Sequence, residues 1–568
     1  MEKSKNNSFG SKLGFILAAA GSAIGLGNIW RFPYLVGRYG GGAFVLIYVL
    51  AVSLLGSVVM IAEMYIGRRA KTNIVLSYNK SSKWLKWVGL LGVLVPFVIS
   101  TYYAVIGGWA SGYAVDFLFG HALGDVIKTT PGMTAGDFFG AFISDPLAII
   151  FFILFLAATL LIVCGGVQGG IEKANKIMMP ALFVLVVAVM IYGFTMKPSA
   201  GQTTVVIDGS TVGTYDNSVV GGLQFYMGSF NFEALGWRGT IAAMTQAFYS
   251  LSLGMGVMVS YGSYTGKNTN LGKSALTVCF LDTLVALLAG FAIFPAMFAT
   301  GNGGNVGAGA GLLFISLSQV FSTMAGGNVV GFLFFTFVIF AALTSLMSLV
   351  EVVSQYTLEK YNWSRKKATL TFGGLIGLIG IFVCISQGYR GYNLFGFDLL
   401  TYFDEVTNNV LMPIIAFMGC ITVGYVIKPK TVFKELEEMG SSFKGQKVWM
   451  ALCMSVTPIL LIVVFIMGVK GNWESYAAKD LNYGWVFGGS MLVMVISWVW
   501  NFLQDNEKWQ ARKARKKEAE KIAVAAYQED HEENEPPCAE NVDACACDNN
   551  WNTCDCGCDC NKSEDATK

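Results

Sequence analysis

The sequence predicts an all-α membrane protein with twelve transmembrane helices. Of its 568 residues, 54% are hydrophobic and only 13% are charged, and the mean hydropathy is +0.55. Apolar windows of roughly 20 residues, long enough to cross a hydrocarbon core of about 30 Å as helices, recur from end to end. Two of these windows carry several glycines near their centres. The first two observations indicate the membrane class, and the third indicates that two helices are broken.

The predicted spans follow one another between residues 11 and 503. They run over residues 11–37, 41–67, 88–118, 147–165, 175–196, 240–264, 271–299, 328–358, 366–387, 400–427, 448–469 and 483–503. We interpret the first as a retained helix, because NIWRFPY and a second long apolar run follow it, unlike a secretory signal. Residues 1–10 precede the spans, and residues 504–568 form a tail.

Positive charge predicts the orientation of the chain, because cytoplasmic loops are rich in Lys and Arg. With the N-terminus in the cytoplasm, only seven of the 39 Lys and Arg residues fall in outer loops: Arg38, Lys128, Lys197, Arg238, Arg390, Lys470 and Lys479. We therefore expect a multi-pass protein of the plasma (inner) membrane with both termini cytoplasmic.

Glycine-rich interruptions lie in the first and sixth spans. The first reads AGSAIGLGNIWRFP over residues 20–33, and the sixth reads QAFYSLSLGMGVMVSY over residues 246–261. In the bilayer core, irregular chain survives only where it is buried in protein or lines a cavity. Gly21 and Gly25 alone would also suit close packing of two helices. Because spans one and six hold matching places in two five-helix halves, the pair favours a midplane substrate site in a secondary transporter.

Three stretches carry a family resemblance: NIWRFPYLVGRYGGGAF, QAFYSLSLGMG and AALTSLMSLVE. They resemble the neurotransmitter:sodium symporters, especially bacterial sodium-coupled amino-acid transporters of the leucine-transporter type, a family that also supplies the type example of paired broken spans. The resemblance implies two inverted repeats of five helices, residues 11–196 and 240–427, joined by an extracellular loop over 197–239. Residues 428–503 then hold two further helices. The implied activity is sodium-driven uptake of an amino acid by alternating access.

Two sodium sites are implied by the resemblance, with the oxygen ligands that a hard cation prefers. The first site consists of the Ala23 carbonyl, the side chains of Asn28, Ser250 and Asp282, and the substrate's carboxylate. The second consists of the carbonyls of Gly21, Ile24 and Ala341 and the hydroxyls of Thr344 and Ser345. The alternative for these two hydroxyls is that they bond back to their own helix.

Asp282 is a charged residue inside an apolar span, ALTVCFLDTLVALLAG, that contains no basic residue. An ionised carboxylate at a helix centre costs roughly 2.5 to 3.5 kcal/mol on insertion scales, and a bound cation would offset that cost. A protonated aspartate with a structural role is the alternative.

Chloride is not expected as a co-ion. Chloride-dependent relatives have a serine where this chain has Ala286, while Tyr48, Gln246 and Ser250 match the rest of their chloride pocket. Asp282 lies one helical turn before Ala286, and we interpret it as the source of the fixed negative charge. We therefore expect transport to be independent of chloride.

The substrate pocket is also placed by the resemblance. Monoamine carriers of the family have an aspartate at the position of Gly25, so its absence here favours a substrate with a free α-carboxylate, which Tyr103 and the broken helix would bind. The residues implied for substrate contact are Ala23, Gly25, Leu26, Gly27, Ile99, Tyr103, Tyr249, Ser250, Ser252, Met255, Ser345 and Leu349. This mostly apolar set, with one adaptable methionine, predicts a hydrophobic or aromatic amino acid. Tyr103, Met255 and Leu349 are the members that would also suit ordinary packing.

Gates are expected on both sides of the pocket. On the outer side, Arg31 resembles the family's gate arginine and Asp404 its partner, while Tyr249 would cap the substrate. On the inner side, Glu359 replaces the usual aspartate. The family's N-terminal arginine and tryptophan are replaced by Asn6 and Phe9, so Lys3 or Lys5 would have to pair with the glutamate.

Gly170 and Pro180 enclose nine residues, IEKANKIMM, at the start of the fifth span. Both residue types weaken a helix, and local unwinding here would admit water to the second sodium site, as the family pattern suggests. A plain loop-to-helix boundary with the proline in the first turn is the alternative.

The tail changes composition sharply after a basic amphipathic stretch that suits the inner membrane surface. Seven of the twelve cysteines lie between residues 538 and 560, including Cys554, Cys556, Cys558 and Cys560. Such thiolates could bind a soft metal ion such as Zn or Cu(I) in a reducing cytoplasm. A disordered acidic tail with incidental thiols is the alternative.

Other classes of protein are disfavoured. The two histidines, His121 and His531, fall in no catalytic or metal motif, which argues against an enzyme, and neither a basic stripe nor a nucleic-acid motif is present. Two alternatives remain within the same fold: a membrane amino-acid sensor that has lost transport, and a proton-coupled carrier.

Overall fold

The computed structural model describes residues 8–119, 133–207, 210–266, 269–304, 310–324, 326–388, 393–478, 481–499 and 518. The chain divides into two compact units, Met1–Trp498 and Val499–Lys568, and the description below concerns the first. The tail cysteines, and with them the proposed soft-metal ligands Cys554, Cys556, Cys558 and Cys560, lie outside the described residues. So do Lys3, Lys5 and Asn6 of the expected inner gate.

The first unit is built from long apolar helices, which confirms the all-α membrane class. Nine helices within the described ranges are long and apolar enough to cross a membrane: Gly42–Ala70, Lys83–Phe119, Pro146–Cys164, Val167–Phe194, Leu271–Ala299, Gly327–Tyr361, Arg365–Gln387, Leu399–Ile427 and Gln446–Ala477. A tenth is the bent pair Lys12–Ala23 and Gly27–Arg38, whose two parts meet at 51°. The predicted twelfth span corresponds to a shorter apolar helix, Gly484–Val499.

Several spans consist of more than one helical element. The elements of the first half are α1 (Lys12–Ala23), η2 (Gly27–Arg31), α2 (Phe32–Arg38), α3 (Gly42–Ala51), η3 (Val52–Gly56), α4 (Ser57–Ala70), α5 (Ile74–Ser81), η4 (Lys83–Leu85), α6 (Lys86–Phe119), α8 (Ala135–Ser144), α9 (Pro146–Cys164), η5 (Val167–Glu172) and α10 (Lys173–Phe194). A hairpin of β1 (Gln202–Ile207) and β2 (Ser210–Asp216) follows, with α11 (Val219–Leu223) and η6 (Gln224–Gly228) after it.

The second half begins with the other broken span. Its elements are α12 (Phe232–Ser250), α13 (Val257–Ser263), α14 (Leu271–Ala299), η7 (Leu312–Leu317), α15 (Ser318–Thr323), α16 (Gly327–Tyr361), α17 (Arg365–Gln387), β3 (Asn393–Leu394), β4 (Phe397–Asp398), α18 (Leu399–Asp404), η8 (Glu405–Leu411) and α19 (Met412–Ile421). After it come η9 (Thr422–Ile427), α20 (Pro429–Glu438), α21 (Gln446–Met454) and α22 (Val456–Ala477).

Packing between helices repeats from one half to the other. The first span contacts the seventh through α1 and α14, and the sixth contacts the second through α13 and α4. In the same way the fifth span contacts the eighth through α10 and α16, and the tenth contacts the third through α19 and α6. Exchanging the two halves therefore maps each of these four pairs onto another of the four, which agrees with an internal repeat.

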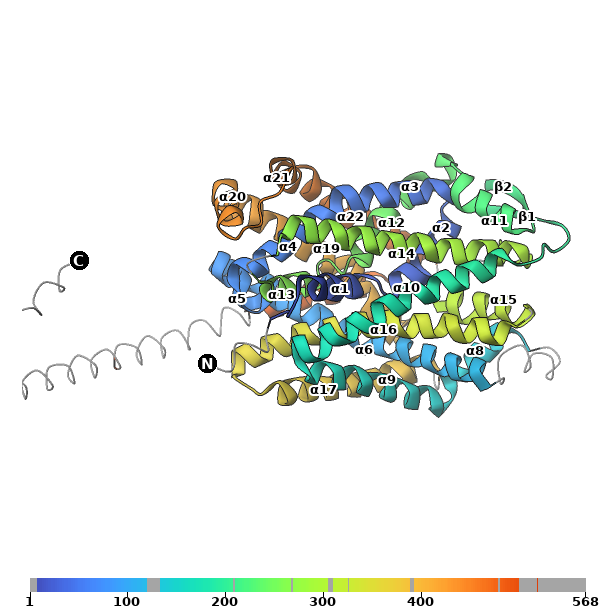
Figure 1. Ribbon diagram of the computed structural model, residues 1–568, viewed down its shortest axis with the longest axis horizontal. Coiled ribbons are helices and arrows are strands. Elements are labelled where there is room, and N and C mark those ends of the chain that lie inside the picture. Colours follow the sequence, from blue (N-terminus) through green and yellow to red (C-terminus); the bar gives the residue numbers. More distant parts are fainter. Residues whose placement is uncertain are drawn as a thin grey trace, which may run out of the picture. The chain divides into compact units, whose positions relative to one another are not determined.

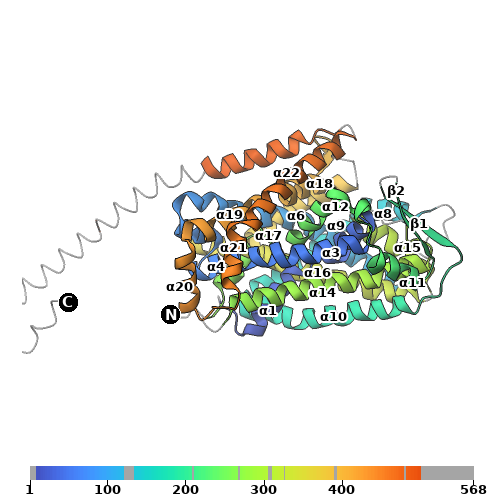
Figure 2. The ribbon, with the colours of Figure 1, turned by 90° about the horizontal axis from the view of Figure 1, so that it is seen from above.

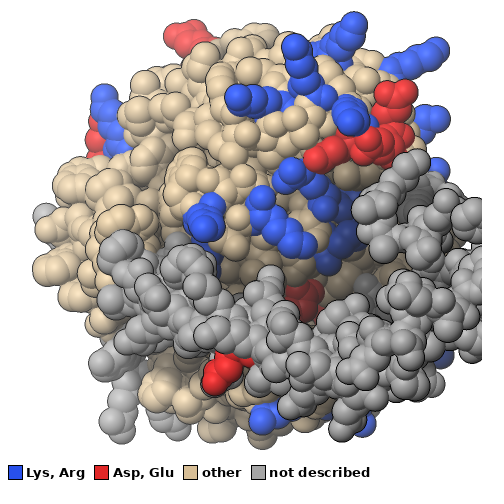
Figure 3. Space-filling model, turned by 90° about the vertical axis from the view of Figure 1, so that its left-hand side faces the viewer, with Lys and Arg blue, Asp and Glu red and all other residues tan. Residues whose placement is uncertain are grey.

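The two ends of the helical unit differ in their loops and charge. Figure 1 shows β1, β2, α8, α11 and α15 at one end and α5, α20 and the first described residues at the other, and Figure 2 shows the same separation from above. Lys and Arg side chains gather on the end that carries α5 and α20 (Figure 3). This is the end that the charge distribution along the sequence assigns to the cytoplasm.

The sixth span breaks because its residues adopt conformations that no helix allows. Helix α12 ends at Ser250 and α13 begins at Val257, and Ser252, Gly254 and Gly256 between them have positive φ angles of 52°, 72° and 73°. Glycine tolerates this conformation because it has no Cβ. A Cβ on Gly254 would also lie 2.5 Å from the Met412 carbonyl oxygen, so both backbone angle and space require glycine there.

The fifth span starts earlier than predicted. The π-helix Val167–Glu172 and α10 form one apolar helix from Val167 to Phe194, whereas the sequence predicted a start at residue 175. Pro180 therefore lies inside α10 and not in a first turn, so the loop-to-helix alternative for this segment is wrong. The residues between Gly170 and Pro180 are helical in this structure.

A substitution at Gly67 tests the close packing of α4 against α13. A Cβ at this position would lie 1.8 Å from the Val259 carbonyl oxygen, which is main chain and must move. We expect Gly67→Ala to lower the free energy of unfolding by about 1–3 kcal/mol, the usual range for overpacking. Thermal unfolding in detergent measures the effect.

Gly140→Ala in α8 is the matched control, because nothing lies within 4 Å of the Cβ it would add. It should leave stability unchanged or raise it by up to about 1 kcal/mol, since glycine is a poor helix residue. Equal effects of the two substitutions would contradict the packing described for α4 and α13.

Candidate functional site

The break in the first span is held open by side chains that take over two main-chain amides. The Gly25 amide donates to the Asn28 side-chain oxygen at 3.1 Å, and the Leu26 amide donates to the Tyr103 hydroxyl at 2.9 Å. In a continuous helix these amides would donate to the carbonyls of Gly21 and Ser22. Both carbonyls are thereby left without a helical partner at the end of α1.

Hydroxyl groups from the second half approach these carbonyls. Ser345 of α16 donates to the Ser22 carbonyl at 3.1 Å and to the Gly21 carbonyl at 3.4 Å. Ser252, in the break of the sixth span, donates to the Ser22 carbonyl at 2.7 Å. The two breaks therefore meet through main-chain oxygen and serine hydroxyls, far apart in sequence but adjacent in the fold.

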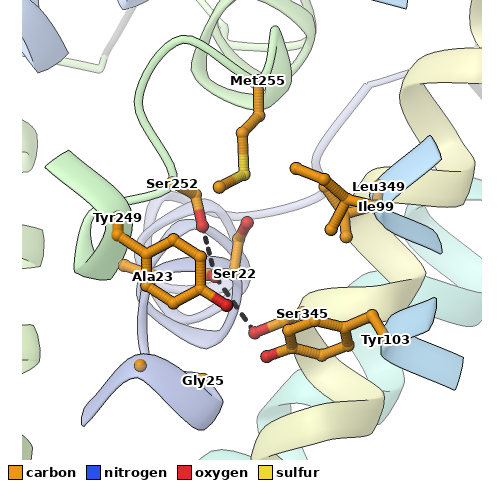
Figure 4. Close-up of a pocket in the computed structure, with 11 residues that line it drawn as sticks. Ser22, Ala23, Gly25, Ile99, Tyr103, Tyr249, Ser252, Met255, Ser345 and Leu349 are labelled. Atoms are coloured by element: carbon orange, nitrogen blue, oxygen red, sulfur yellow. Dashed lines mark hydrogen bonds between the residues drawn. The ribbon is translucent and has the colours of Figure 1, made fainter. Parts of the chain in front are cut away.

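A small cavity of about 20 Å³ lies between the two breaks. Figure 4 shows Ile99, Met255 and Leu349 on one side of it and the hydroxyls of Tyr103 and Ser345 near Gly25 on the other. This volume holds about one water molecule, so the walls lie close together in this conformation and must move apart to admit a larger ligand. The residues that line it are Ser22, Ala23, Gly25, Gly27, Ile99, Tyr103, Tyr249, Ser252, Met255, Ser345 and Leu349.

Ten of the residues implied for substrate contact line this cavity, while Leu26 and Ser250 do not. Leu26 takes part through its amide bond to Tyr103, and Ser250 bonds to Asp282 instead. Ser22 lines the cavity but was missed by the sequence reasoning. Its position inside the glycine-rich interruption was the signal that could have found it.

Gly25 and Gly27 leave room that any side chain would fill. A Cβ on Gly25 would lie 2.6 Å from both the Ser345 and the Tyr103 hydroxyl oxygens, and a Cβ on Gly27 would lie 2.8 Å from the Tyr249 ring. The cavity is thus bounded by main chain on the side of the first break. A ligand can approach the amides and carbonyls there directly.

Asp282 lies at the centre of a buried polar cluster that includes three of the four residues implied for the first sodium site. Its carboxylate accepts hydrogen bonds from the side-chain nitrogen of Asn28 at 2.8 Å and from the Ser250 hydroxyl at 2.9 Å. The Tyr48 hydroxyl also donates to it, at 3.4 Å. No Lys or Arg pairs with it among the described residues. Ala23, the fourth residue, lines the neighbouring cavity.

The residues implied for the second sodium site are only partly brought together. Ser345 bonds to Gly21, as described, and Ile24 lies at the same break, where its amide donates to Ala20. Thr344, however, donates to the carbonyls of Phe340 and Ala341 in its own helix, each at 3.0 Å. In this structure Thr344 therefore adopts the back-bonded arrangement that was the alternative for it.

These two groups of oxygen atoms have the chemistry of an alkali-ion site. They combine freed carbonyls, hydroxyls that can turn their lone pairs toward a cation, and one carboxylate, all of them hard donors. In the part of the chain that the structure describes, no group of three or more His, Cys, Asp or Glu side chains has the arrangement of a metal site. The donors present therefore suit sodium better than a transition metal.

On the outer side, the predicted pair of Arg31 and Asp404 does not form an ion pair among the described residues. Arg31 donates to the Gln246 side chain at 3.1 Å, and its guanidinium lies 5.0 Å from the centre of the Tyr249 ring. Asp404 accepts from Tyr102 at 2.9 Å and from Asn408. Each group thus has a neutral partner in this conformation, and the gate pair across the outer vestibule stays a prediction.

On the inner side, neutral groups among the described residues bind Glu359. Its carboxylate accepts from the Asn73 main-chain amide and side chain, each at 2.8 Å, and from Thr72, which places it at the start of α5. Gln355 donates to its other oxygen at 3.1 Å. The expected partners of Glu359, Lys3 and Lys5, lie outside the described residues, so its role as a gate stays a prediction.

A different set of residues closes the inner end of the site. Phe9 packs against Phe15, Tyr261 and Tyr264 with ring centres 5.4–6.3 Å apart. Below it, the buried Glu351 pairs with Arg365 at 2.6 Å and accepts from Tyr264 at 2.7 Å. The sequence reasoning missed Glu351, although an acid within the span AALTSLMSLVE was a visible signal.

Comparison with known proteins now decides the family. Residues 6–123 and 146–503 match the sequence model of the sodium:neurotransmitter symporter family. The chain belongs to this family. YhdH, an uncharacterized sodium-dependent transporter of Bacillus subtilis, is 35% identical to this chain. The match covers 82% of this chain and 98% of YhdH. A second uncharacterized sodium-dependent transporter, from Haemophilus influenzae, is 31% identical over 81% of this chain and 98% of its own length.

A solved structure agrees with this assignment. The crystal structure of MhsT in complex with L-phenylalanine matches the symporter with a TM-score of 0.70 and 36% identity, over 81% of this chain and 99% of MhsT. The protein is thus a sodium-dependent transporter of this family and not an enzyme, as the sequence predicted. Its fold is that of MhsT.

A substitution at Gly25 tests whether the cavity is the substrate-binding site of this symporter. Gly25→Ala places a methyl group against Tyr103 and Ser345, so we expect substrate affinity to fall by about tenfold or more. Equilibrium binding of labelled amino acid to the purified protein measures it. Gly169→Ala, where nothing lies within 4 Å of the added Cβ, serves as the control and should bind like the wild type; a Gly25 variant with unchanged affinity would contradict this placement.

Proposed function

We propose that this symporter takes up a hydrophobic or aromatic amino acid together with sodium, by alternating access. The observation that carries the proposal is the cavity between the two broken spans, where freed main-chain oxygens and an apolar wall meet. MhsT, the structural relative described above, was crystallised with L-phenylalanine. A cavity lined by Ile99, Met255 and Leu349 is suited to a side chain of that kind.

The polar side of the cavity suits the α-carboxylate of the substrate. Tyr103 directs its hydroxyl to the Leu26 amide beside Gly25, where no side chain intervenes. Main-chain amides at the start of a half-helix, together with a tyrosine hydroxyl, favour an anion. The carboxylate would thus lie beside the first sodium ion, and each charge lowers the cost of burying the other.

Two sodium ions account for the two groups of oxygen atoms. Under this proposal the first is bound by Ala23, Asn28, Ser250, Asp282 and the substrate. The second is bound by Gly21, Ile24, Ala341, Thr344 and Ser345, which requires Thr344 to turn its hydroxyl lone pairs away from its own helix. Because the first ion touches the substrate and both touch the first break, binding of ion and substrate is coupled.

The orientation of the protein follows from the distribution of charge. The end of the helical unit rich in Lys and Arg faces the cytoplasm under the positive-inside rule. Under this proposal, Tyr249 and Arg31, whose ring and guanidinium lie 5.0 Å apart, cover the outer side of the cavity, and the Phe9 cluster covers the inner side. Alternating access would open one of these two covers at a time.

Uptake into proteoliposomes tests the function. We expect an inward sodium gradient to drive accumulation of phenylalanine, leucine or related amino acids, and we expect potassium not to replace sodium. Aspartate and lysine should not compete, because the apolar wall offers no partner for a second charge. Binding of an amino acid without accumulation would instead favour a sensor, and uptake driven by a proton gradient alone would favour the proton-coupled alternative.

Chloride independence is a separate prediction and rests on Asp282. Its carboxylate already accepts bonds from Tyr48 and Ser250, two of the groups that match the family's chloride pocket. We expect uptake to be unchanged when gluconate replaces chloride, and Asp282→Asn to lose uptake in gluconate and recover part of it in chloride. Wild-type uptake that collapses in gluconate would refute this role for Asp282.

A further inference from the structure

The first and fifth spans meet along an unusual seam, in which glycines of one helix face polar side chains of the other. Helices α1 and α10 lie side by side in both views (Figures 1 and 2). A Cβ added to each of three glycines at or near α1 would lie 2.4 Å or less from a polar atom: Gly10 faces Gln168, Gly14 faces Glu172 and Gly21 faces Asn175. We call Gln168, Glu172 and Asn175 the polar seam. Glu172 and Asn175 are buried, whereas Gln168 is exposed, and buried polar groups need hydrogen-bond partners.

The inner part of the polar seam is fully bonded. Glu172 is buried and accepts from the Gly10 amide at 2.6 Å, from the Ser11 hydroxyl at 2.9 Å and from the Lys176 ammonium at 2.7 Å. These contacts tie the start of α1 to the fifth span. They satisfy the carboxylate and explain its presence.

Asn175 is the member of the polar seam that its contacts do not explain. Its side chain is fully buried, and its amide nitrogen donates to the Ile171 carbonyl at 2.9 Å. Its side-chain oxygen has no donor among the described residues. A buried amide oxygen without a donor is unfavourable, so such an atom points to a partner that binds there for part of the time.

The unpaired oxygen lies against the first break. It is 2.1 Å from the point that a Cβ on Gly21 would take, so only glycine allows it to rest on this main chain. The Gly21 carbonyl has lost its helical amide, and among the described residues the Ser345 hydroxyl approaches it at 3.4 Å. One residue of the candidate second sodium site therefore has a spare hard oxygen beside it.

We propose that the Asn175 side-chain oxygen is a sodium contact at the inner edge of the second site, taken up as the ion leaves Gly21 and Ser345 for the cytoplasm. The inference rests on the proposed function and adds a residue to it. An amide oxygen is a hard, neutral ligand of the kind that sodium prefers, and it replaces part of the hydration shell during exit.

The test separates sodium affinity on the inner side from that on the outer side. Wild-type protein, Asn175→Leu and Asn175→Asp are reconstituted in liposomes, and sodium-driven uptake of labelled phenylalanine is measured against rising intravesicular sodium. For Asn175→Leu we expect the half-inhibitory intravesicular concentration to rise by about tenfold, the lower end of the range for loss of a group that supports a metal site. The half-saturating external concentration should change by less than about twofold.

Asn175→Asp should lower the half-inhibitory intravesicular sodium concentration, because a carboxylate attracts the ion more strongly than an amide does. A role in packing alone would impair both variants in the same direction, so a shared direction, or no change in either variant, overturns the proposal. Asn175→Ala replaces the leucine variant if that does not fold, with the same expected rise. Thr159→Ala is the matched control, since Thr159 is a buried hydroxyl in the neighbouring α9 bonded to its own helix at 3.0 Å.

Failure of the proposed function would be visible separately. If wild-type protein shows no sodium-driven uptake, the function is wrong, but Asn175 is still tested by the rise in melting temperature that added sodium causes. The expected order of that rise is Asn175→Asp above wild type above Asn175→Leu. Equal rises in all three proteins would overturn the sodium contact.

Discussion

The architecture of this symporter depends on two main-chain amides that do not close the first helix. Because the Gly25 amide bonds to Asn28 and the Leu26 amide bonds to Tyr103, the carbonyls of Gly21 and Ser22 are available in the middle of the membrane. A buried carbonyl without a partner is costly in such an environment. Serine hydroxyls supply partners in this structure, and in the proposed cycle sodium does so.

The same constraint explains why the rest of the fold surrounds the breaks so closely. Irregular chain at membrane depth must be shielded from lipid, and here α14 and α16 of the seventh and eighth spans pack against α1, while Tyr103 of α6 bonds to the break. Glycine at positions 25, 27 and 254 removes side chains that would keep these segments apart. Packing and chemistry thus require glycine at the same positions, so we expect a substitution at one of these three glycines to affect both stability and binding.

Much of the site could be predicted from the sequence, because a glycine-rich interruption inside an apolar span is a local pattern with a physical meaning. The long spans and both breaks were of this kind, and so were Asn28, Tyr103 and Asp282 once the family was recognised. What the sequence could not predict is which partners each side chain finds in space. Glu359 bonds to Asn73 and Asp404 bonds to Tyr102 among the described residues, and no sequence pattern records these contacts. The start of the fifth span was missed because a π-helix continues where glycines predicted a loop.

Binding of the substrate therefore depends on an alkali ion of the right size, held by the freed carbonyls and by Asp282. The most direct test of this dependence is equilibrium binding of phenylalanine to the purified protein, titrated in sodium and in potassium at the same ionic strength. We expect saturable binding of phenylalanine whose affinity rises steadily with the sodium concentration, and no binding in potassium. Equal affinity in the two salts would mean that the freed carbonyls and Asp282 do not couple ion to substrate, and it would contradict the central claim.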